Sequence, residues 1–420
     1  MLLGCIADDL TGATDLGVTL AREGLSVTQV NGVPDAKLEI PTGDAVVVAL
    51  KSRTNAPQEA IDWSLSALHW LRSRGAERIY FKYCSTFDST AKGNIGPVAE
   101  ALLEALGAEF TVATPAYPRN GRTVYLGHLF VGEALLSDSG MRNHPLTPMT
   151  DSNLVRVLAS QTRGKVGLVP YAVLEGGAQA VGAQCRALRE AGCRHAILDA
   201  TRDEHLEAAG AACLDLALST GGAGLGMGLA RALARQGKVR RAKGEASLPR
   251  VDGAAVVLSG SCSEATLDQV AAARVRFESF RLEPERLAEG GAQVSEALEW
   301  ASQRLGAKPV MIYASAPPER VARARKALGQ ERAATLVEEA FRALAQGLAA
   351  RGARRFVVAG GETSGAVVEA LGVRALAIGP EISPGVPWTA ALDGKPYLLA
   401  LKSGNFGERD FFSRAFEVLA

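Results

Sequence analysis

The sequence predicts an α/β protein of two domains, each a mostly parallel sheet with helices on both faces. Short apolar runs such as DAVVVAL and HAILDA alternate with longer amphipathic segments. Parallel strands covered by helices are buried on both faces, so continuous apolar runs are typical of them. The chain has 420 residues, 47% of them hydrophobic, and is longer than a single core usually grows. We expect a ligand cleft between the two domains.

The first half of the chain follows a strand–helix alternation as far as a charged segment. The predicted strands are 2–7, 44–50, 78–83, 109–114, 165–170 and 195–200, and the predicted helices are 57–74, 92–107, 176–191 and 202–219. The segment 116–150, rich in Gly, Pro and Asn, interrupts this order, as functional insertions often do. The charged, non-periodic segment 236–250 is predicted to be a linker, which gives domains 1–235 and 251–420.

The alternation restarts after the linker. Strands are expected at 254–260, 279–284, 309–315 and 354–361, with helices at 284–303, up to about 351 and after 361. The runs 375–382 and 397–404 follow with no long helix between them, and a helix at 407–419 comes last. The second domain, like the first, is predicted to be a mostly parallel sheet.

Charge and composition exclude several classes of protein. There are 46 basic and 45 acidic residues, so nothing indicates binding to nucleic acid or to an anionic membrane. No window has the ~18 apolar residues of a membrane span, and the N-terminus does not resemble a signal peptide. The six cysteines form no C-x-x-C pair and are expected to be buried thiols. We expect a cytoplasmic protein.

Two adjacent carboxylates follow the first predicted strand, in the sequence IADDLTGATDLG. Ligands of open α/β sheets bind where strands end and helices begin, so Asp8 and Asp9 are candidate catalytic residues. The alternative is that Asp9 or Thr11 caps the following helix. A cap accounts for one of these residues but not for the pair.

Basic residues follow two other strands of the first domain. Lys51 and Arg53 come after VVVAL, and Lys82 lies in an apolar strand end close to Asp88 and Ser89. A buried lysine is unfavourable unless it is paired, and an arginine can hold a carboxylate through two hydrogen bonds. These five residues are candidates for binding a small hydroxylated acid. The alternative is a structural ion pair between Lys82 and Asp88.

Two strand-to-helix turns of the second domain favour a phosphate or nucleotide ligand. The first is Ser259-Gly260-Ser261-Cys262-Ser263, where backbone N–H groups and hydroxyls of Ser259 and Ser261 precede a helix. The alternative is that Ser263 and Thr266 only cap that helix. Neither this turn nor any other part of the chain matches the P-loop pattern.

The second turn is Gly360-Gly361-Glu362-Thr363. The glycines allow a ligand to approach the backbone, and the helix N-terminus favours an anion. A glutamate beside a phosphate indicates Mg²⁺ or a ribose, because the two anions would otherwise repel each other. The alternative is a tight turn with a capping threonine.

A cluster of glycines occupies 219–233, in STGGAGLGMGLARAL. It does not match the dinucleotide-binding fingerprint. Two interpretations stay open, a ligand loop and a close crossing of two helices.

Six segments together resemble the four-carbon acid sugar kinase family. They are CIADDLTGATDLG, KYCSTFDSTAKGNIGP, SGSCSEAT, VVAGGETSGAVVEAL, IGPEISPGVPW and LALKSGNFG. The resemblance covers essentially the whole chain, and the segment 120–158 is most similar to the 3-oxo-tetronate kinase branch. It implies an N-terminal sugar-acid-binding domain and a C-terminal nucleotide-binding domain.

The resemblance also implies an activity, which is phosphorylation of the 4-hydroxyl of a 3-oxo-tetronate with ATP. It places the ATP site on Ser259, on Gly360 to Thr363 and on Gly404. Asp8 or Asp9 would accept the proton of the hydroxyl, and Mg²⁺ would bridge phosphate oxygens through ligands that the sequence does not assign.

Three alternatives remain open. One is a non-catalytic regulator that senses a sugar acid or a nucleotide, a second is a kinase for threonate or erythronate, and a weaker third is a dehydrogenase. The oligomeric state is open too, with a homodimer as one alternative.

Overall fold

The computed structural model describes residues 1–420 except 42, 145, 240–247, 307 and 420. Contacts within the chain divide it into two compact units, Met1–Lys243 and Gly244–Ala420. Most of the predicted linker, 236–250, falls on residues 240–247, which lie outside the described residues. The domain boundaries at 235 and 251 therefore stay a prediction.

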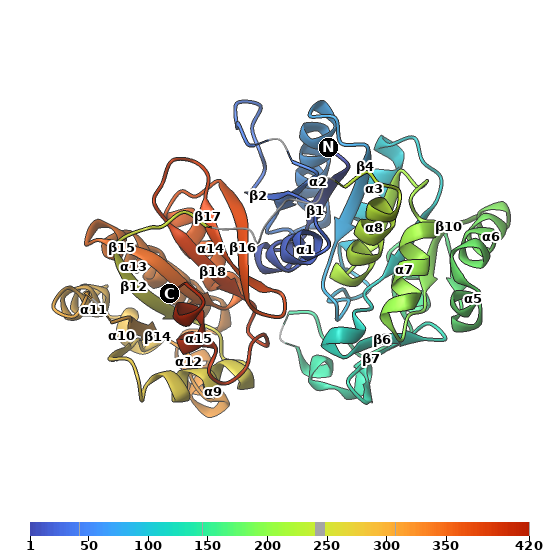
Figure 1. The fold of residues 1–420 in the computed structure, drawn as a ribbon. Coiled ribbons are helices and arrows are strands. Elements are labelled where there is room, and N and C mark those ends of the chain that lie inside the picture. The colour runs from blue at the N-terminus through green and yellow to red at the C-terminus, as the bar shows by residue number, and fades with distance from the viewer. Residues whose placement is uncertain (42, 145, 240–247, 307, 420) are drawn as a thin grey trace. The chain divides into compact units, whose positions relative to one another are not determined.

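The first unit contains one large parallel sheet (Figure 1). Its strands follow the order β2-β3-β1-β4-β11-β5-β10-β9, and every neighbouring pair is parallel. This confirms the mostly parallel sheet that was predicted for the first half of the chain. The strands are β1 (Leu3–Ala7), β2 (Val27–Asn31), β3 (Ala45–Ala49), β4 (Arg78–Lys82), β5 (Thr111–Thr114), β9 (Lys165–Val169), β10 (Cys193–Leu198) and β11 (Leu218–Gly221).

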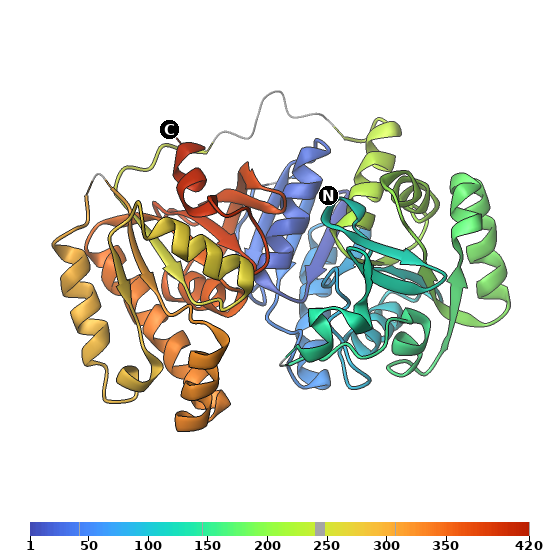
Figure 2. The ribbon, with the colours of Figure 1, turned by 90° about the horizontal axis from the view of Figure 1, so that it is seen from below.

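Helices cover both faces of this sheet (Figures 1 and 2). Successive residues of a strand therefore enter different cores, as Cys5 and Ala7 of β1 pack in one hydrophobic cluster and Ile6 in another. All three are fully buried. The helices are α1 (Leu10–Arg22), α2 (Pro57–Ser73), α3 (Ile95–Ala105), α4 (Leu154–Ala159), α5 (Tyr171–Glu175), α6 (Gly177–Glu190), α7 (Asp203–Ala212) and α8 (Ala223–Arg235).

The prediction of one helix over 202–219 is wrong at its C-terminal end. Helix α7 ends at Ala212, and Leu218–Gly221 forms β11, a buried strand between β4 and β5. This strand has only one large apolar residue, Leu218, so it lacks the apolar run by which the other strands were identified. Strand β2, with the sequence VTQVN, was missed for a similar reason.

The glycine cluster at 219–233 is a close crossing of two helices. It contributes the last residues of β11 and most of α8, which packs on α7. A Cβ on Gly228 would overlap with the backbone of Leu206, and one on Gly210 would overlap with the backbone of Gly228. Small residues are therefore required by the approach of the two helix backbones, which favours the second interpretation.

The segment 116–150 contains a small antiparallel sheet of three strands, β6 (Arg122–Tyr125), β7 (His128–Val131) and β8 (Ala134–Leu135). Short 3-10 turns follow at Leu136–Asp138 and Gly140–Asn143. The carboxylate of Asp199 accepts hydrogen bonds from the N–H groups of Leu126 and Gly127 at 2.7 and 2.8 Å. Asp199 follows β10, so this contact attaches the insertion to the edge of the main sheet.

The second unit contains a mixed sheet in the order β13-β14-β12-β15-β18-β17-β16. Strand β17 is antiparallel to both of its neighbours, and the other pairs are parallel, which confirms the predicted absence of a long helix in this region. The strands are β12 (Ala254–Ser259), β13 (Ser279–Arg281), β14 (Val310–Tyr313), β15 (Ala353–Ala359), β16 (Ala375–Ser383), β17 (Val386–Ala391) and β18 (Leu398–Lys402).

Glycines divide two helices that the sequence predicted as continuous. The segment 284–303 is interrupted at Gly290 and Gly291, whose φ angles are 109° and 75°. The long helix is interrupted at Gly329, with φ 83°. The helices are α9 (Glu264–Ala273), α10 (Pro284–Leu287), α11 (Ala292–Ser302), α12 (Pro318–Leu328), α13 (Gln330–Ala350), α14 (Gly361–Ala370) and α15 (Phe411–Glu417).

The cysteines differ partly from the prediction. Cys5, Cys185 and Cys213 are buried, whereas Cys262 is exposed in the turn after β12. In the described part of the chain, no helix combines the length and the apolar character needed to cross a membrane.

Candidate active site

The first cluster of candidate residues lies where three neighbouring strands of the first unit end. Asp8 follows β1, and its N–H group donates to the carbonyl of Lys82, the last residue of β4, at 3.0 Å. The carbonyl of Asp8 accepts from the N–H groups of Ser52 and Arg53, which follow β3. Backbone pairing of the parallel strands thus brings Asp8, Arg53 and Lys82 to one edge of the sheet.

Arg53 brings together the carboxylates of three aspartates. Its Nε and one terminal nitrogen donate to the two oxygens of Asp8, at 2.9 and 2.8 Å. The same terminal nitrogen donates to Asp9 at 2.6 Å, and the other lies 3.7 Å from Asp88. The Nε edge of the guanidinium is therefore occupied by Asp8, which limits how Arg53 could hold the carboxylate of a substrate.

Three acids around one guanidinium leave an excess of negative charge. Burial raises the pKa of Asp8, and the adjacent Asp9 raises it further, against the opposing effect of Arg53. Burial also acts on Asp9, but the positive charges of Arg53 and Lys82 outweigh it and lower the pKa of Asp9. The two neighbouring carboxylates therefore differ in basicity, and Asp8 is the stronger proton acceptor.

Asp9 is the N-cap of α1. Its side chain accepts from the N–H group of Gly12 at 3.1 Å and from the hydroxyl of Thr11 at 2.8 Å. This confirms the capping interpretation for Asp9, and it leaves Asp8 as the residue of the pair that no cap explains.

The side chain of Lys82 is fully inside the unit. Its Nζ donates to the carbonyl of Tyr83 at 2.8 Å, and the structure shows no ion pair between Lys82 and Asp88 in the part of the chain that it describes. A Cβ on Gly12 would come within 3.1 Å of this Nζ, so the ammonium lies beside the first turn of α1. Lys82 was predicted either to bind the substrate or to pair with Asp88. It lies instead under the turn that Asp9 caps.

The segment that carries Asp88 has a strained backbone. Phe87 has a φ of 51°, a region that residues with a Cβ rarely occupy. Its ring is fully buried and meets the ring of Tyr83 edge-on at 5.3 Å. Asp88 accepts a hydrogen bond from the hydroxyl of Thr86 at 2.6 Å. Packing of Phe87 thus holds a conformation that directs the next residue, Asp88, toward Arg53.

The remaining two predicted substrate residues have different surroundings. Ser89 is buried, and its hydroxyl accepts a hydrogen bond from Nε2 of Gln161 at 2.7 Å. Lys51 is exposed. Ser89 therefore helps to hold the segment in place, whereas Lys51 faces solvent after β3.

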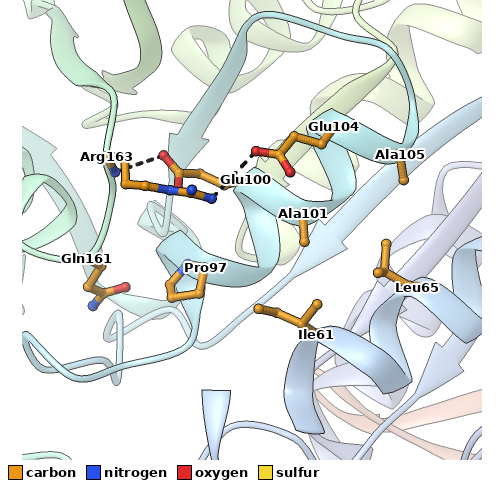
Figure 3. A pocket seen from close by; sticks show the side chains of 9 residues that line it. All are labelled: Ile61, Leu65, Pro97, Glu100, Ala101, Glu104, Ala105, Gln161 and Arg163. Atoms are coloured by element: carbon orange, nitrogen blue, oxygen red, sulfur yellow. Dashed lines mark hydrogen bonds and ion pairs between the residues drawn. The ribbon is translucent and has the colours of Figure 1, made fainter. Parts of the chain in front are cut away.

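Gln161 also lines a surface hollow between α2 and α3 (Figure 3). The hollow has an apolar floor that includes Ile61 and Leu65, and an ion pair of 3.4 Å joins Arg163 to Glu100 at its rim. None of the predicted site residues lines it.

The second cluster lies where strands β12, β15 and β18 of the second unit end. After β12, Ser263 caps α9 by accepting from the N–H group of Thr266, which confirms the capping interpretation of this turn. The carbonyl of Gly404, after β18, accepts from the hydroxyls of Ser263 and Thr266 at 2.7 and 2.8 Å. A Cβ on Gly404 would overlap with the hydroxyl of Ser261. The turns after β12 and β18 are thus in direct contact.

The predicted serines of this turn differ in accessibility. Ser259 is fully buried and its hydroxyl lies 2.8 Å from that of Ser315. Ser261 is partly exposed, and its hydroxyl lies 3.2 Å from that of Ser263. Ser261 is therefore the better placed of the two to meet a ligand through its side chain.

The glycines after β15 have two different roles. Gly360 has a φ of 115° and lies against the N–H group of Ser261, so it has to be a glycine. A Cβ on Gly361 would meet no atom within 4 Å. Gly361 begins α14, followed by exposed Glu362 and buried Thr363. The first turn of this helix therefore has open space at Gly361, which leaves room for a ligand to approach.

Lys402 is the functional candidate that the sequence analysis missed. It ends β18, is fully buried, and its Nζ donates to the carbonyl of Gly404 at 2.9 Å. The signal was present, because Lys402 lies in the apolar strand end LLALKSG just as Lys82 lies in RIYFKYC.

Comparison with known proteins matches both units. Residues 3–229 match the model of a sugar-binding N-terminal domain, and residues 256–412 match that of a nucleotide-binding C-terminal domain. A 3-oxo-tetronate kinase of Pseudomonas fluorescens is 56% identical, with 100% of this chain and 97% of that relative covered. A 3-oxo-tetronate kinase of Burkholderia multivorans is 54% identical over the same shares.

A solved structure shows the same fold. It is a protein of Salmonella typhimurium LT2, described there as a candidate tRNA synthase, that is 46% identical and superimposes with a TM-score of 0.87. The match covers 98% of each chain.

Proposed function

This chain belongs to the four-carbon acid sugar kinase family, in the branch of the 3-oxo-tetronate kinases, and on that premise we propose its reaction. It transfers the γ-phosphoryl group of ATP to the 4-hydroxyl of a 3-oxo-tetronate, which gives the 4-phosphate and ADP. The observation that carries the proposal is the chemical difference between the two clusters. One cluster combines carboxylates with an arginine and a lysine in the unit that matches a sugar-binding model, and the other combines hydroxyls with the N-terminus of a helix in the unit that matches a nucleotide-binding model.

We assign Asp8 as the base. The 4-hydroxyl would lose its proton to a carboxylate oxygen of Asp8 while the hydroxyl oxygen bonds to the γ-phosphorus and the bond to ADP breaks. Arg53 would keep Asp8 oriented through its two hydrogen bonds. Asp9 would act through α1, whose first turn it fixes.

The four-carbon acid would bind at the same strand ends. We assign its contacts to Lys51, Arg53, Lys82, Asp88 and Ser89. Lys51 is exposed. Arg53 would bind the acid through the edge of its guanidinium that faces Asp88. An anionic acid would be repelled by the three aspartates. The positive charges of Lys51, Arg53 and Lys82 would offset this repulsion.

The nucleotide would bind at the turns of the second unit. We assign its contacts to Ser259, Ser261, Gly360, Gly361, Glu362, Thr363 and Gly404. The open space at Gly361 would admit the phosphates to the N–H groups of α14. The buried Ser259 would contribute through its backbone or by supporting the turn.

Mg²⁺ fits this site as an ion carried by the nucleotide. Among the described residues, no group of three or more His, Cys, Asp and Glu side chains is placed to bind a metal. Mg²⁺ commonly needs only one or two carboxylates beside phosphate oxygens, and Glu362 on the first turn of α14 can supply one. When bound with ATP, the ion neutralises the charge that develops on the phosphate oxygens.

An ADP-release assay over a panel of four-carbon acids tests the proposal. We expect turnover with ATP and a 3-oxo-tetronate. Turnover with threonate or erythronate instead would mean that the substrate assignment is wrong. Binding of a four-carbon acid with no ADP release from ATP would favour the non-catalytic regulator, and oxidation or reduction of a nicotinamide cofactor would favour a dehydrogenase.

A further inference from the structure

Lys402 joins three parts of the second unit through one ammonium group. Its Nζ donates to the hydroxyl of Thr266 at 3.0 Å, and to the carbonyls of Ser403 and Gly404 at 3.0 and 2.9 Å. Thr266 lies in the first turn of α9, and Gly404 lies in the turn after β18. The ammonium thus connects the N-terminus of α9 to the turn that we assign to the nucleotide.

The charge of this ammonium has no carboxylate partner among the described residues. All three acceptors are neutral, and the fourth neighbour is the ring of Phe411, with its centroid 5.9 Å from Nζ. Helix α9 presents Thr266, α15 presents Phe411 and the turn presents carbonyls, while α14, which also packs on β18, carries Glu362 in its first turn. Burial alone lowers the pKa of Lys402 to about 7. A buried cation of this kind is unfavourable unless an anion approaches it.

The carbonyl of Gly404 shows where that anion would act. It accepts three hydrogen bonds, from Ser263, Thr266 and Lys402. The hydroxyl of Ser263 also caps α9. Loss of the ammonium would therefore change both the position of Gly404 and the positive field at this helix end, without removing any group that contacts solvent.

We propose that Lys402 is a positioning residue of the nucleotide site, whose ammonium holds the Gly404 turn on α9 and takes the polyphosphate as its counter-charge. The inference rests on the nucleotide site assigned above. It implies that nucleotide binding stabilises the protonated lysine, so that the protein takes up a proton when it binds ADP at pH 8.

The test is calorimetry with ADP and Mg²⁺ on the full chain, from pH 6 to 9 and in two buffers of different ionisation enthalpy. Lys402→Met removes the charge, and Lys402→Gln removes the charge but keeps a donor. The matched control is Lys395→Met, which removes a half-exposed ammonium paired with Asp393 in the same unit. At pH 6 we expect both Lys402 variants to bind ADP about tenfold more weakly or worse, the usual effect of losing an interaction with a charged group.

The pH dependence distinguishes positioning from a merely structural role. The difference in ADP affinity between the wild type and the Lys402 variants should shrink toward pH 9. The wild type should take up a proton on binding ADP at pH 8, and neither Lys402 variant should do so. The free energy of unfolding without ligand gives a second readout. Because the pKa of Lys402 is lower in the folded than in the unfolded state, the stability of the wild type should rise with pH between about 7 and 10. Lys402→Met should lack this rise.

Two results would overturn the inference. If the wild type and both Lys402 variants bind ADP equally at every pH, Lys402 does not position the nucleotide, while the proposed function stands. If the wild type itself binds no ADP although it is folded, the nucleotide site and the role of Lys402 are both wrong.

Discussion

Arg53 holds both carboxylate oxygens of Asp8, at 2.9 and 2.8 Å, across 45 positions of the sequence. This contact fixes the orientation of Asp8, while its burial keeps it more basic than an ordinary aspartate. The contact therefore suits the roles that we propose, with Asp8 as the base and Arg53 as its support. Asp9 caps the next helix, whereas no cap accounts for Asp8.

Replacement of the two aspartates should give unequal effects. Asp8→Asn should lower kcat by ~10²–10⁴-fold, because the amide cannot accept the proton of the attacking hydroxyl. Asp9→Asn should be milder, because asparagine also caps helices well. Steady-state kinetics measure both, and Asp151→Asn, at an exposed ion pair with Arg156, is the control. Near-normal kcat in both variants would mean that the base lies elsewhere, with Asp88 the next residue to change.

Arg53→Gln should move the acid limb of the pH–rate profile to higher pH. The base must be ionised, so activity falls as the pH drops through the pKa of Asp8. The positive charge of Arg53 lowers that pKa, and its removal should raise it further. The measurement is kcat/KM as a function of pH, with Arg156→Gln as the matched control at an exposed pair. An unchanged acid limb, with only KM increased, would make Arg53 a substrate clamp and not a support for Asp8.

Gly361→Val should block nucleotide binding while the protein stays folded. The side chain would enter the open space beside the first turn of α14, where we place the phosphates, and its Cβ would meet no atom within 4 Å. Gly365→Val is the control, because it makes the same change one turn later in the same helix, also without a contact. Calorimetry should show loss of ADP binding in the first variant alone, and unchanged binding of the four-carbon acid in both. Equal loss of both ligands in Gly361→Val would mean that the turn is not specific for the nucleotide.

Much of the fold could be predicted because parallel strands buried on both faces leave apolar runs in the sequence. Strand β1, with LGCIA, and strand β3, with AVVVA, are examples. Strand β11 could not be found in this way, because LSTG has one large apolar side chain and is a strand only through its position between β4 and β5. Tertiary context, and not local pattern, decides such a segment.

The candidate site was predicted in its parts but not in its contacts. The position of Asp8 and Asp9 at a strand end was visible, as was the need for glycine near Gly360. The pairing of Arg53 with Asp8 was not visible in the sequence, because contacts between side chains that are distant in the chain depend on the order of the strands. Lys402 was overlooked for a related reason, because its burial follows from the packing of α9 and Phe411 around the end of β18.

The most direct test of the reaction is to identify the product. The protein would be incubated with ATP, Mg²⁺ and a 3-oxo-tetronate, and the product would be analysed by phosphorus NMR with coupling to the adjacent protons. We predict one phosphate ester on the oxygen of carbon 4, formed in equal amount with ADP, and no ester with Asp8→Asn. ADP formation without a phosphorylated acid, or a phosphate on the oxygen of carbon 2, would contradict it.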